Sequence, residues 1–316
     1  MIKNKKNILI LGGLGFIGKN LIEEFLLDVN YNIIVFNFKN QPLDNKWLNK
    51  NVKLYYGDFT LVTDLEKIFK ENKIDIIFHL ISTTIPSSSN NIIADINHNL
   101  GGTIKLLDLM RNYDIKKIIF FSSGGTIYGL PNGSFPDRFS EDYQNNPICS
   151  HGIVKLTIEK YLYLYKHFYS IDYLILRLAN PFGEYHFSSV QGLINVTLKN
   201  IANNEPTTIW GSGEVIRDYI YVKDCVRVIK NLIDKNIYND IINIGSGLGY
   251  SVNEVLNMIK KITGDFKINR LESRKFDVPK IVLDVSKIKS IINFKPTDIK
   301  IGIEKTYNWI LKNSYE

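Results

Sequence analysis

Four glycines near the N-terminus have the spacing of a turn that binds phosphate groups. They are Gly12, Gly13, Gly15 and Gly18, and they follow an apolar run at 8–11 that predicts a buried strand. Gly12 permits a tight turn, Gly15 lets the backbone approach a pyrophosphate, and Gly18 lets the next helix pack against the strand. The N–H groups and the dipole of that helix favour an anion. The residues predicted to hold a dinucleotide are Gly12, Gly15, Phe16, Ile17 and Gly18.

The end of the second predicted strand bears on the choice between NAD and NADP. An acidic residue is expected there, about 20 residues after the glycines, to bind the adenosine ribose. This chain has Asn37 instead, whose amide can bond a ribose hydroxyl without repelling a 2′-phosphate, and Lys39 could attract that phosphate. We expect NAD, and NADP stays open. Asp58 follows the third predicted strand, where a carboxylate can accept from the adenine amino group or cap a turn.

The elements around these residues alternate between short β-branched runs and longer amphipathic stretches. The predicted strands are 7–11, 32–36, 52–56, 74–80, 117–122 and 172–178. The predicted helices include 15–27, 62–72, 96–113 and 150–169. This alternation predicts an α/β protein with a Rossmann-type, doubly wound parallel sheet, because parallel strands need helical crossovers.

The pattern of strands and helices becomes irregular after about residue 180. We therefore predict a dinucleotide-binding domain over 1–179 and a smaller C-terminal substrate-binding domain over 180–316. A strand at 241–245 is expected to return to the first sheet, so that 238–248 belongs to the first domain.

Composition and charge narrow the possible partners. Of the 316 residues, 45% are hydrophobic, which is enough for one large core or two moderate ones. The net charge of +7 comes from scattered lysines without an aromatic-lined basic stripe, so we expect an anionic small molecule rather than nucleic acid. The histidines show no ligand spacing, and we predict no metal site. The two cysteines form no disulfide framework and no apolar stretch reaches about 18 residues, so we expect a cytoplasmic protein that does not enter a membrane.

Ordered motifs along nearly the whole chain resemble one enzyme family. They include the segments 57–59, 78–80, 99–103, 121–129, 176–183 and 217–221. Together with the glycine turn, these segments resemble the extended short-chain dehydrogenase/reductase family, in its UDP-glucose 4-epimerase-like branch of nucleotide-sugar epimerases and dehydratases. The resemblance implies bound NAD and a nucleoside-diphosphate sugar, with UDP as the expected nucleotide. It also implies cofactor contacts at Asn37, Asp58, Phe59, Leu80, Asn99 and Lys155.

The catalytic positions of that family are altered in this chain. In the family, a tyrosine removes a proton from a sugar hydroxyl while a hydride leaves the same carbon. A lysine four residues later binds the nicotinamide ribose and lowers the tyrosine pKa, and a serine or threonine completes the proton contact. Here Lys155 matches the lysine, but His151 stands at the tyrosine position and Gly124 at the serine or threonine position.

Three interpretations of His151 stay open. A neutral imidazole is a competent base near pH 7, and the charge of Lys155 would keep it neutral, with Ser123 or Thr126 supplying the hydroxyl. Imidazole is about 1–2 Å shorter than phenol, and such a misplacement can cost about 100-fold in rate. The chain could instead bind cofactor and substrate with weak or no turnover, or carry a substitution introduced to trap substrate. The catalytic candidates are His151, Lys155, Ser123 and Thr126.

The resemblance places the substrate on polar residues of the C-terminal half. Arg217 and Arg274 match positions that grip the diphosphate, to which guanidinium groups are suited. Asn180 matches a position that donates to the diphosphate, and Asp277 matches one that contacts the nucleoside ribose or orients the arginine. Because these residues are kept while the proton relay is changed, binding is easier to predict than turnover.

These observations leave three functions from different classes. We expect a nucleotide-sugar 4-epimerase that oxidises C4 transiently with bound NAD. An NADP-dependent nucleotide-sugar 4-ketoreductase and a weakly active or inactive nucleotide-sugar-binding protein are the alternatives. A 4,6-dehydratase is disfavoured because its Asp-Glu pair is replaced by Gly125 and Thr126. The family also implies a homodimer formed through the helices 96–113 and 150–169, and a role in polysaccharide biosynthesis.

Overall fold

The computed structural model describes residues 5–38, 47, 52–84, 91–274 and 277–313. The chain divides into two compact units. The first unit contains residues 1–123, 149–176 and 232–242, and the second contains 124–148, 177–231 and 243–316. Both units are therefore assembled from discontinuous stretches of the sequence.

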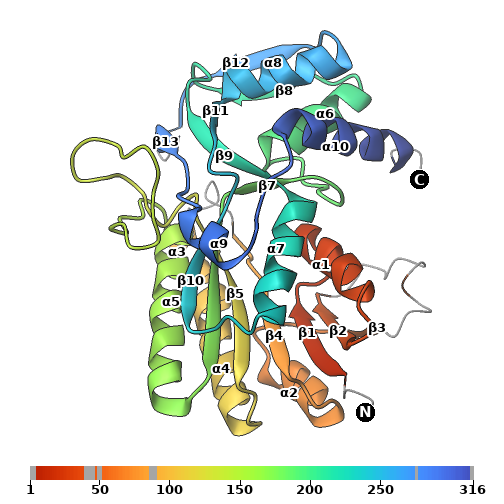
Figure 1. Cartoon of the computed structure of the whole chain (residues 1–316), viewed down its shortest axis with the longest axis vertical. Coiled ribbons are helices and arrows are strands. Elements are labelled where there is room, and N and C mark those ends of the chain that lie inside the picture. The colour runs from red at the N-terminus through yellow and green to blue at the C-terminus, as the bar shows by residue number, and fades with distance from the viewer. Residues whose placement is uncertain (1–4, 39–46, 48–51, 85–90, 275–276, 314–316) are drawn as a thin grey trace. The chain divides into compact units, whose positions relative to one another are not determined.

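A seven-stranded sheet forms the centre of the first unit (Figure 1). Its strand order is β10-β6-β5-β4-β1-β2-β3, and β1 runs parallel to both of its neighbours. The chain runs from β1 through β2 and β3 and then returns to β4 on the other side, so the carboxyl end of β1 is the switch point at which such sheets bind ligands. The predicted Rossmann-type, doubly wound α/β sheet is confirmed. The strands are β1 (Lys6–Leu11), β2 (Tyr31–Asn37), β3 (Val52–Tyr56), β4 (Ile76–His79), β5 (Lys117–Ser123), β6 (Asp172–Leu178) and β10 (Asp240–Ile244).

Helices pack on both faces of this sheet, because the side chains of each strand alternate between the faces. Leu9 and Leu11 of β1 belong to a core cluster with buried residues of α2, α4 and α5. Ile10 points to the opposite face with its β4 partner Phe78, whose ring lies 5.3 Å from that of Phe25 on α1. The helices of this unit are α1 (Phe16–Leu26), α2 (Val62–Glu71), α3 (Ile92–Asp95), α4 (Gly102–Asn112) and α5 (Ser150–Tyr169).

The start of the predicted helix 96–113 is wider than an α-helix. Residues Ile96–Gly101 form a π-helix, η3, and α4 begins at Gly102. Side-chain contacts hold the backbone here, since the Thr103 hydroxyl donates to the Asn99 carbonyl at 2.6 Å and the Asn99 side chain accepts the Thr83 amide at 2.9 Å. Apolar spacing could not show this, because a π-turn displaces the pattern by only one residue. Such turns are frequent at functional sites.

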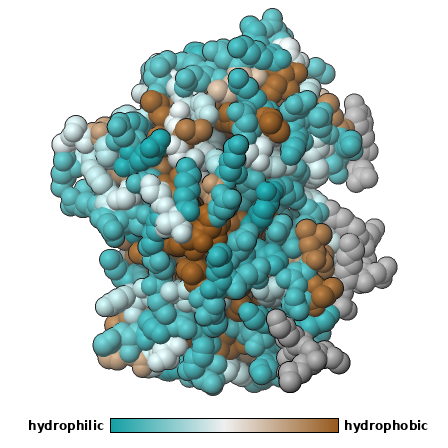
Figure 2. Space-filling model, in the orientation of Figure 1, coloured by the Kyte–Doolittle hydropathy of each residue, from teal (hydrophilic) through white to brown (hydrophobic). Residues whose placement is uncertain are grey.

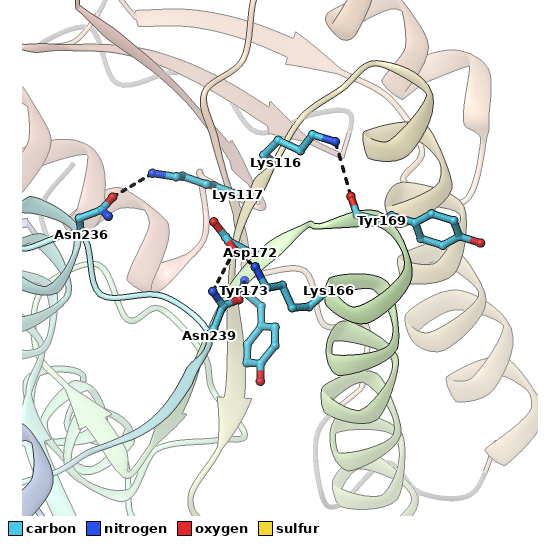
Figure 3. Close-up of polar contacts among 8 residues, drawn as sticks. All are labelled: Lys116, Lys117, Lys166, Tyr169, Asp172, Tyr173, Asn236 and Asn239. Carbon is cyan, nitrogen blue, oxygen red and sulfur yellow. Dashed lines mark hydrogen bonds and ion pairs between the residues drawn. The ribbon is translucent and has the colours of Figure 1, made fainter.

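The last segment of the first unit is fixed by polar contacts beside β6 (Figure 3). Asn239 donates to Asp172 Oδ1 at 2.8 Å, and Lys166 near the end of α5 forms an ion pair with the same oxygen at 2.6 Å. Lys117 of β5 donates to Asn236 at 2.9 Å. These contacts hold β10 at the edge of the sheet. Strand β10 lies next to β6, at the place of the strand predicted at 241–245.

The second unit has smaller sheets and a core of its own. Strand β9 pairs with β7, β11 and β13, and β8 pairs with β12. Apolar residues of β7, β9, α6, α8 and α10 form its core, among them Phe182, Tyr219 and Ile303. Helix α7 (Val222–Asp234) runs from this unit into the first. The other elements are β7 (Asn180–Phe182), α6 (Leu193–Ala202), β8 (Thr207–Trp210), β9 (Ile216–Tyr221), β11 (Gly249–Ser251), α8 (Val252–Thr263), β12 (Ile268–Leu271), β13 (Lys280–Ile281), α9 (Ser286–Ile291) and α10 (Ile299–Asn313).

This division differs from the predicted boundary between residues 179 and 180. The loop 124–148 belongs to the second unit because it bonds to later segments of that unit. Tyr128 donates to Asn243 at 2.6 Å, and the Phe139 amide donates to the Val282 carbonyl at 2.8 Å. The returning segment also spans 232–242 rather than 238–248, because the end of α7 packs with the first unit.

Hydrophilic side chains predominate on the face drawn in Figure 2, and the hydrophobic ones gather in smaller patches. In the part of the chain that the structure describes, no helix combines the length and apolarity needed to cross a membrane. Helix α5 nevertheless exposes large apolar side chains. Ile153, Leu164 and Phe168 are 52%, 40% and 64% exposed, and their spacing places them on one side of the helix.

Candidate active site

The glycine turn lies between β1 and α1 and has the geometry of a phosphate cradle. Gly12 has a φ of +79°, which glycine adopts without strain, and a Cβ on Gly18 would lie 2.5 Å from the Gly13 carbonyl oxygen. Among the described residues no side chain caps α1 at Gly15, and its first turn contains no acidic residue. The positive end of α1 is therefore available to an anion, which fits the pyrophosphate of NAD. The predicted turn residues at this place are Gly12, Gly15, Phe16, Ile17 and Gly18.

Asn37 is at the end of β2, where the adenosine ribose is expected, and it is fixed to the glycine turn. It is 8% exposed and accepts the Leu14 amide through Oδ1 at 3.3 Å. Its Nδ2 donates to the Phe38 carbonyl at 3.3 Å. The amide carries no charge, so this position lacks the repulsion that an aspartate would exert on a 2′-phosphate. Lys39, the residue that could attract such a phosphate, lies outside the described residues.

Asp58 caps a turn in the structure, and its predicted contact with adenine stays a prediction. Its Oδ1 accepts the amide and the hydroxyl of Thr60 at 2.8 and 2.7 Å, and these bonds lower the pKa of Asp58. Phe59 is buried in the core of the first unit. Leu80 donates its amide to the Leu11 carbonyl at 3.1 Å, directly before the glycine turn. In the structure, Phe59 packs in the core and the Leu80 backbone lies beside the glycine turn, and the contact of both residues with a cofactor stays a prediction.

Asn99 connects η3 to the loop at 83–84 and to the end of α3. Its Oδ1 accepts the Thr83 amide at 2.9 Å, and its Nδ2 donates to Asp95 Oδ1 at 2.7 Å and to Thr84 Oγ1 at 3.3 Å. Asp95 is 2% exposed and also accepts the hydroxyls of Thr84 at 2.9 Å and Ser150 at 2.7 Å. Burial opposes the ionisation of Asp95, but the hydrogen bonds from Ser150, Asn99 and Thr84 outweigh it, so its pKa is lowered.

His151 and Lys155 lie one turn apart on α5, and the charge of Lys155 disfavours protonation of His151. Burial lowers the pKa of His151 to about 4, with a further decrease from the charge of Lys155, while Asp95 and a hydrogen bond to the Thr84 backbone oppose the shift. Burial also lowers the pKa of Lys155 to about 8. Lys155 Nζ donates to the Phe121 carbonyl at 2.8 Å. At neutral pH His151 is therefore the neutral imidazole that a proton acceptor has to be.

The backbone around Gly124 leaves no room for a side chain. The Gly124 amide donates to the Leu178 carbonyl at 2.7 Å, and a Cβ would lie 2.9 Å from that oxygen and 2.7 Å from Leu283 Cδ1. The φ of Gly124 is not positive, so space rather than conformation explains the glycine. Ser123 ends β5 and is half-buried. Thr126 Oγ1 is buried without a hydrogen-bond partner among the described residues, so either hydroxyl stays a candidate for the proton contact.

Two arginines and one carboxylate of the second unit lie close together, at positions predicted to bind the diphosphate. Arg274 pairs with Asp277 through Nε–Oδ2 at 2.9 Å and Nη2–Oδ1 at 3.0 Å, and its guanidinium lies 4.8 Å from the Trp210 ring centroid. Arg217 donates to the Val278 carbonyl at 2.6 Å. Burial lowers the pKa of Arg217, the charge of Asp277 opposes this, and the charge of Arg274 adds to it, so the two arginines are electrostatically coupled. Two guanidinium groups with one carboxylate leave a positive charge that suits a diphosphate.

Asn180 and Asp218 fix the strand that carries Arg217. Asn180 Nδ2 donates to the Asp218 carbonyl at 2.9 Å, which ties β7 to β9. The buried carboxylate of Asp218 accepts the amides of Ser246 at 2.8 Å and Gly247 at 3.0 Å. Asn180 therefore supports the arginine strand in the structure, and its donation to a diphosphate stays a prediction.

Comparison with known proteins decides the family. The model of the NAD dependent epimerase/dehydratase family matches residues 8–245. The chain belongs to this family. Membership in the epimerase/dehydratase family identifies NAD as the cofactor, in agreement with the geometry of the glycine turn.

Relatives in this family match the chain over almost its full length. A putative UDP-glucose 4-epimerase of Methanocaldococcus jannaschii is 34% identical over 313 residues, which cover 97% of this chain and 99% of that protein. The dTDP-4-dehydro-6-deoxyglucose reductase of Escherichia coli is 30% identical, with 96% and 98% covered. The crystal structure of UDP-glucose 4-epimerase with UDP-glucose from Thermotoga maritima has a TM-score of 0.89 and 31% identity, with 98% and 100% covered.

Sequence reasoning missed Asp95 and the hydroxyl groups of Thr84 and Ser150, which both donate to Asp95 close to His151. One signal for Asp95 was available, because it stands four residues before Asn99 and so shares a helix face with it. The predicted helix began at Ile96 and left Asp95 outside.

Proposed function

We propose that the protein is a nucleotide-sugar 4-epimerase that acts on a UDP-linked sugar with bound NAD. The observation that carries this proposal is the neutral His151 imidazole beside Lys155 on α5, because transient oxidation at C4 requires the chain to accept a proton. Two relatives named as UDP-glucose 4-epimerases, one of them crystallised with UDP-glucose, support the choice of substrate.

The chain would handle the proton of the C4 hydroxyl. NAD, when bound, supplies reversible hydride transfer at C4. His151 accepts the hydroxyl proton on its imidazole and returns it after the keto sugar has turned its other face to the cofactor. Lys155 stabilises negative charge on the reacting oxygen and keeps the imidazole neutral. Because imidazole reaches about 1–2 Å less far than phenol, we expect slower turnover than a tyrosine would support.

The second unit would bind the nucleoside diphosphate. The guanidinium groups of Arg217 and Arg274 keep their charge and match the geometry of phosphate oxygens. Asp277 orients Arg274 through its bidentate ion pair. The Trp210 ring, stacked with Arg274, offers an apolar wall for the nucleobase.

Two other functions each have a supporting observation. The uncharged Asn37 and the 30% identity to the Escherichia coli dTDP-4-dehydro-6-deoxyglucose reductase favour an NADP-dependent 4-ketoreductase. The replacement of two family catalytic groups by His151 and Gly124 favours a weakly active or inactive nucleotide-sugar-binding protein.

The cofactor retained by the purified protein and its products separate these functions. Mass spectrometry of the released dinucleotide, followed by incubation with UDP-sugars and product analysis by NMR, is the experiment. Retained NAD and formation of the C4 epimer without added cofactor support the epimerase. If the protein instead turns over a 4-keto sugar nucleotide only with added NADPH, the reductase replaces the epimerase as the function. If the protein binds UDP-sugar but forms no product, it is a nucleotide-sugar-binding protein rather than an enzyme.

We also propose that the protein is a homodimer formed through α4 and α5. The apolar side chains of Ile153, Leu164 and Phe168 on one side of α5 support this arrangement. A cytoplasmic location and a role in polysaccharide biosynthesis stay predictions of the sequence.

A further inference from the structure

We propose that Asp95 is the positioning residue that prepares His151 to act as the base. This inference rests on the proposed function, because Asp95 acts only through His151. Asp95 is the last residue of α3 and is 2% exposed. One carboxylate oxygen binds the start of α5 and the other binds the loop at Thr84. Both segments lie beside His151.

The Asp95 carboxylate is connected to His151 by hydrogen bonds from Ser150 and Thr84. Oδ2 accepts the hydroxyl of Ser150, the residue before His151, at 2.7 Å. Oδ1 accepts the hydroxyl of Thr84 at 2.9 Å, and the backbone of Thr84 favours the protonated form of His151. In the described chain, α5 starts without a side-chain cap or an acidic residue in its first turn, so Asp95 also supplies negative charge at this helix end.

The Thr84 backbone beside the imidazole favours one tautomer of His151. A ring N–H that donates to the Thr84 carbonyl leaves the lone pair on the other nitrogen. The same carbonyl accepts the Ser82 hydroxyl at 3.0 Å, so it is held from two sides. Asp95 therefore orients the imidazole as the third group of a catalytic set orients its base.

The charges that face His151 come from α3 and α5. Lys155 disfavours the imidazolium, whereas Asp95 favours it. Lys155 itself is faced by Asp95 and Glu159, and its charge also lowers the pKa of His79 on β4. Asp95 thus raises the basicity of His151 against both burial and the ammonium group, and the imidazole would be a weaker base without it.

The test compares Asp95→Asn with Asp108→Asn. Asparagine keeps the shape of the side chain and removes its charge. Asp108 is a matched control, because it accepts Tyr165 of α5 at 3.0 Å and so binds the same helix at another place. We expect Asp95→Asn to lower the His151 pKa by about one unit in an NMR titration, to move both limbs of the kcat–pH profile to lower pH, and to reduce kcat about three- to tenfold with KM nearly unchanged. Asp108→Asn should match the wild type in each measurement.

Ser150→Ala separates the effect of the Ser150–Asp95 hydrogen bond from the effect of the Asp95 charge. It keeps the carboxylate and removes one hydrogen bond, so it should reduce kcat without moving the pKa of His151. An unchanged His151 titration and unchanged pH limbs in Asp95→Asn, in a protein that turns over, would overturn the role of Asp95 alone. A wild-type protein without turnover would contradict the proposed function itself. If Asp95→Asn does not fold, an unchanged kcat in Ser150→Ala overturns the inference.

Discussion

Replacing Gly124 by alanine should destabilise the protein, although alanine is usually the more favourable residue. The added Cβ would lie 2.9 Å from the Leu178 carbonyl oxygen and 2.7 Å from Leu283 Cδ1. The leucine methyl group can move, but the carbonyl accepts the Gly124 amide at 2.7 Å and cannot retreat without stretching that bond. Overpacking costs about 1–3 kcal/mol, and the reduced freedom of the unfolded chain offsets about 0.4–1 kcal/mol of this. We expect a net loss of about 1–2 kcal/mol.

Guanidinium denaturation of Gly124→Ala, of a control variant and of the wild type measures this difference in the free energy of unfolding. Gly101→Ala is the matched control, because the nearest atom to its Cβ outside the adjacent helix backbone, among the described residues, is the Ile96 carbonyl oxygen at 3.6 Å. There alanine should stabilise the protein by up to about 1 kcal/mol. A Gly124→Ala protein as stable as the wild type would refute the steric reasoning. Gly124→Ser, which restores a family hydroxyl, should show a similar loss and no gain in turnover.

Three further predictions follow from single side chains. Asn37→Asp should shift the ratio of NAD to NADP affinity towards NAD by at least about tenfold, because a carboxylate repels the 2′-phosphate, and an unchanged ratio in calorimetry would contradict this. Burial lowers the pKa of His79 to about 3, so between pH 6.5 and 3 the unfolded chain binds the extra proton and stability falls with falling pH. His79→Gln should reduce that slope by up to about 1.4 kcal/mol per pH unit in denaturation curves, and an unaltered slope would argue against a neutral buried histidine. Phe168→Lys should convert the proposed dimer into monomers in light scattering, whereas a monomeric wild type would exclude the dimer.

The sheet of the first unit was predictable because most of its strands are buried on both faces. Such strands appear as continuous apolar runs, and β6 has the predicted bounds. The π-turn at Ile96–Gly101 was not predictable, because side-chain bonds from Asn99 and Thr103 rather than apolar spacing hold it. The division into units was also hidden, since it depends on contacts of the loop 124–148 with much later residues.

Parts of the candidate site that depend on local spacing were accessible from the sequence. The glycine turn and the four-residue separation of His151 and Lys155 are of this kind. Contacts between distant segments were not accessible. The bond from Ser150 to Asp95 joins residues 55 positions apart, and Leu283 limits the space at Gly124 from a distant part of the chain.

The role of His151 as proton acceptor is tested most directly by the rate of C4 epimerisation of UDP-glucose in His151→Ala and in the wild type, with retained NAD quantified in both. His167→Ala is the control, because His167 is exposed on the same helix. We expect His151→Ala to keep its NAD and to lose turnover by at least about 100-fold, while His167→Ala keeps the wild-type rate. Equal rates in His151→Ala and the wild type would contradict the assignment of the base.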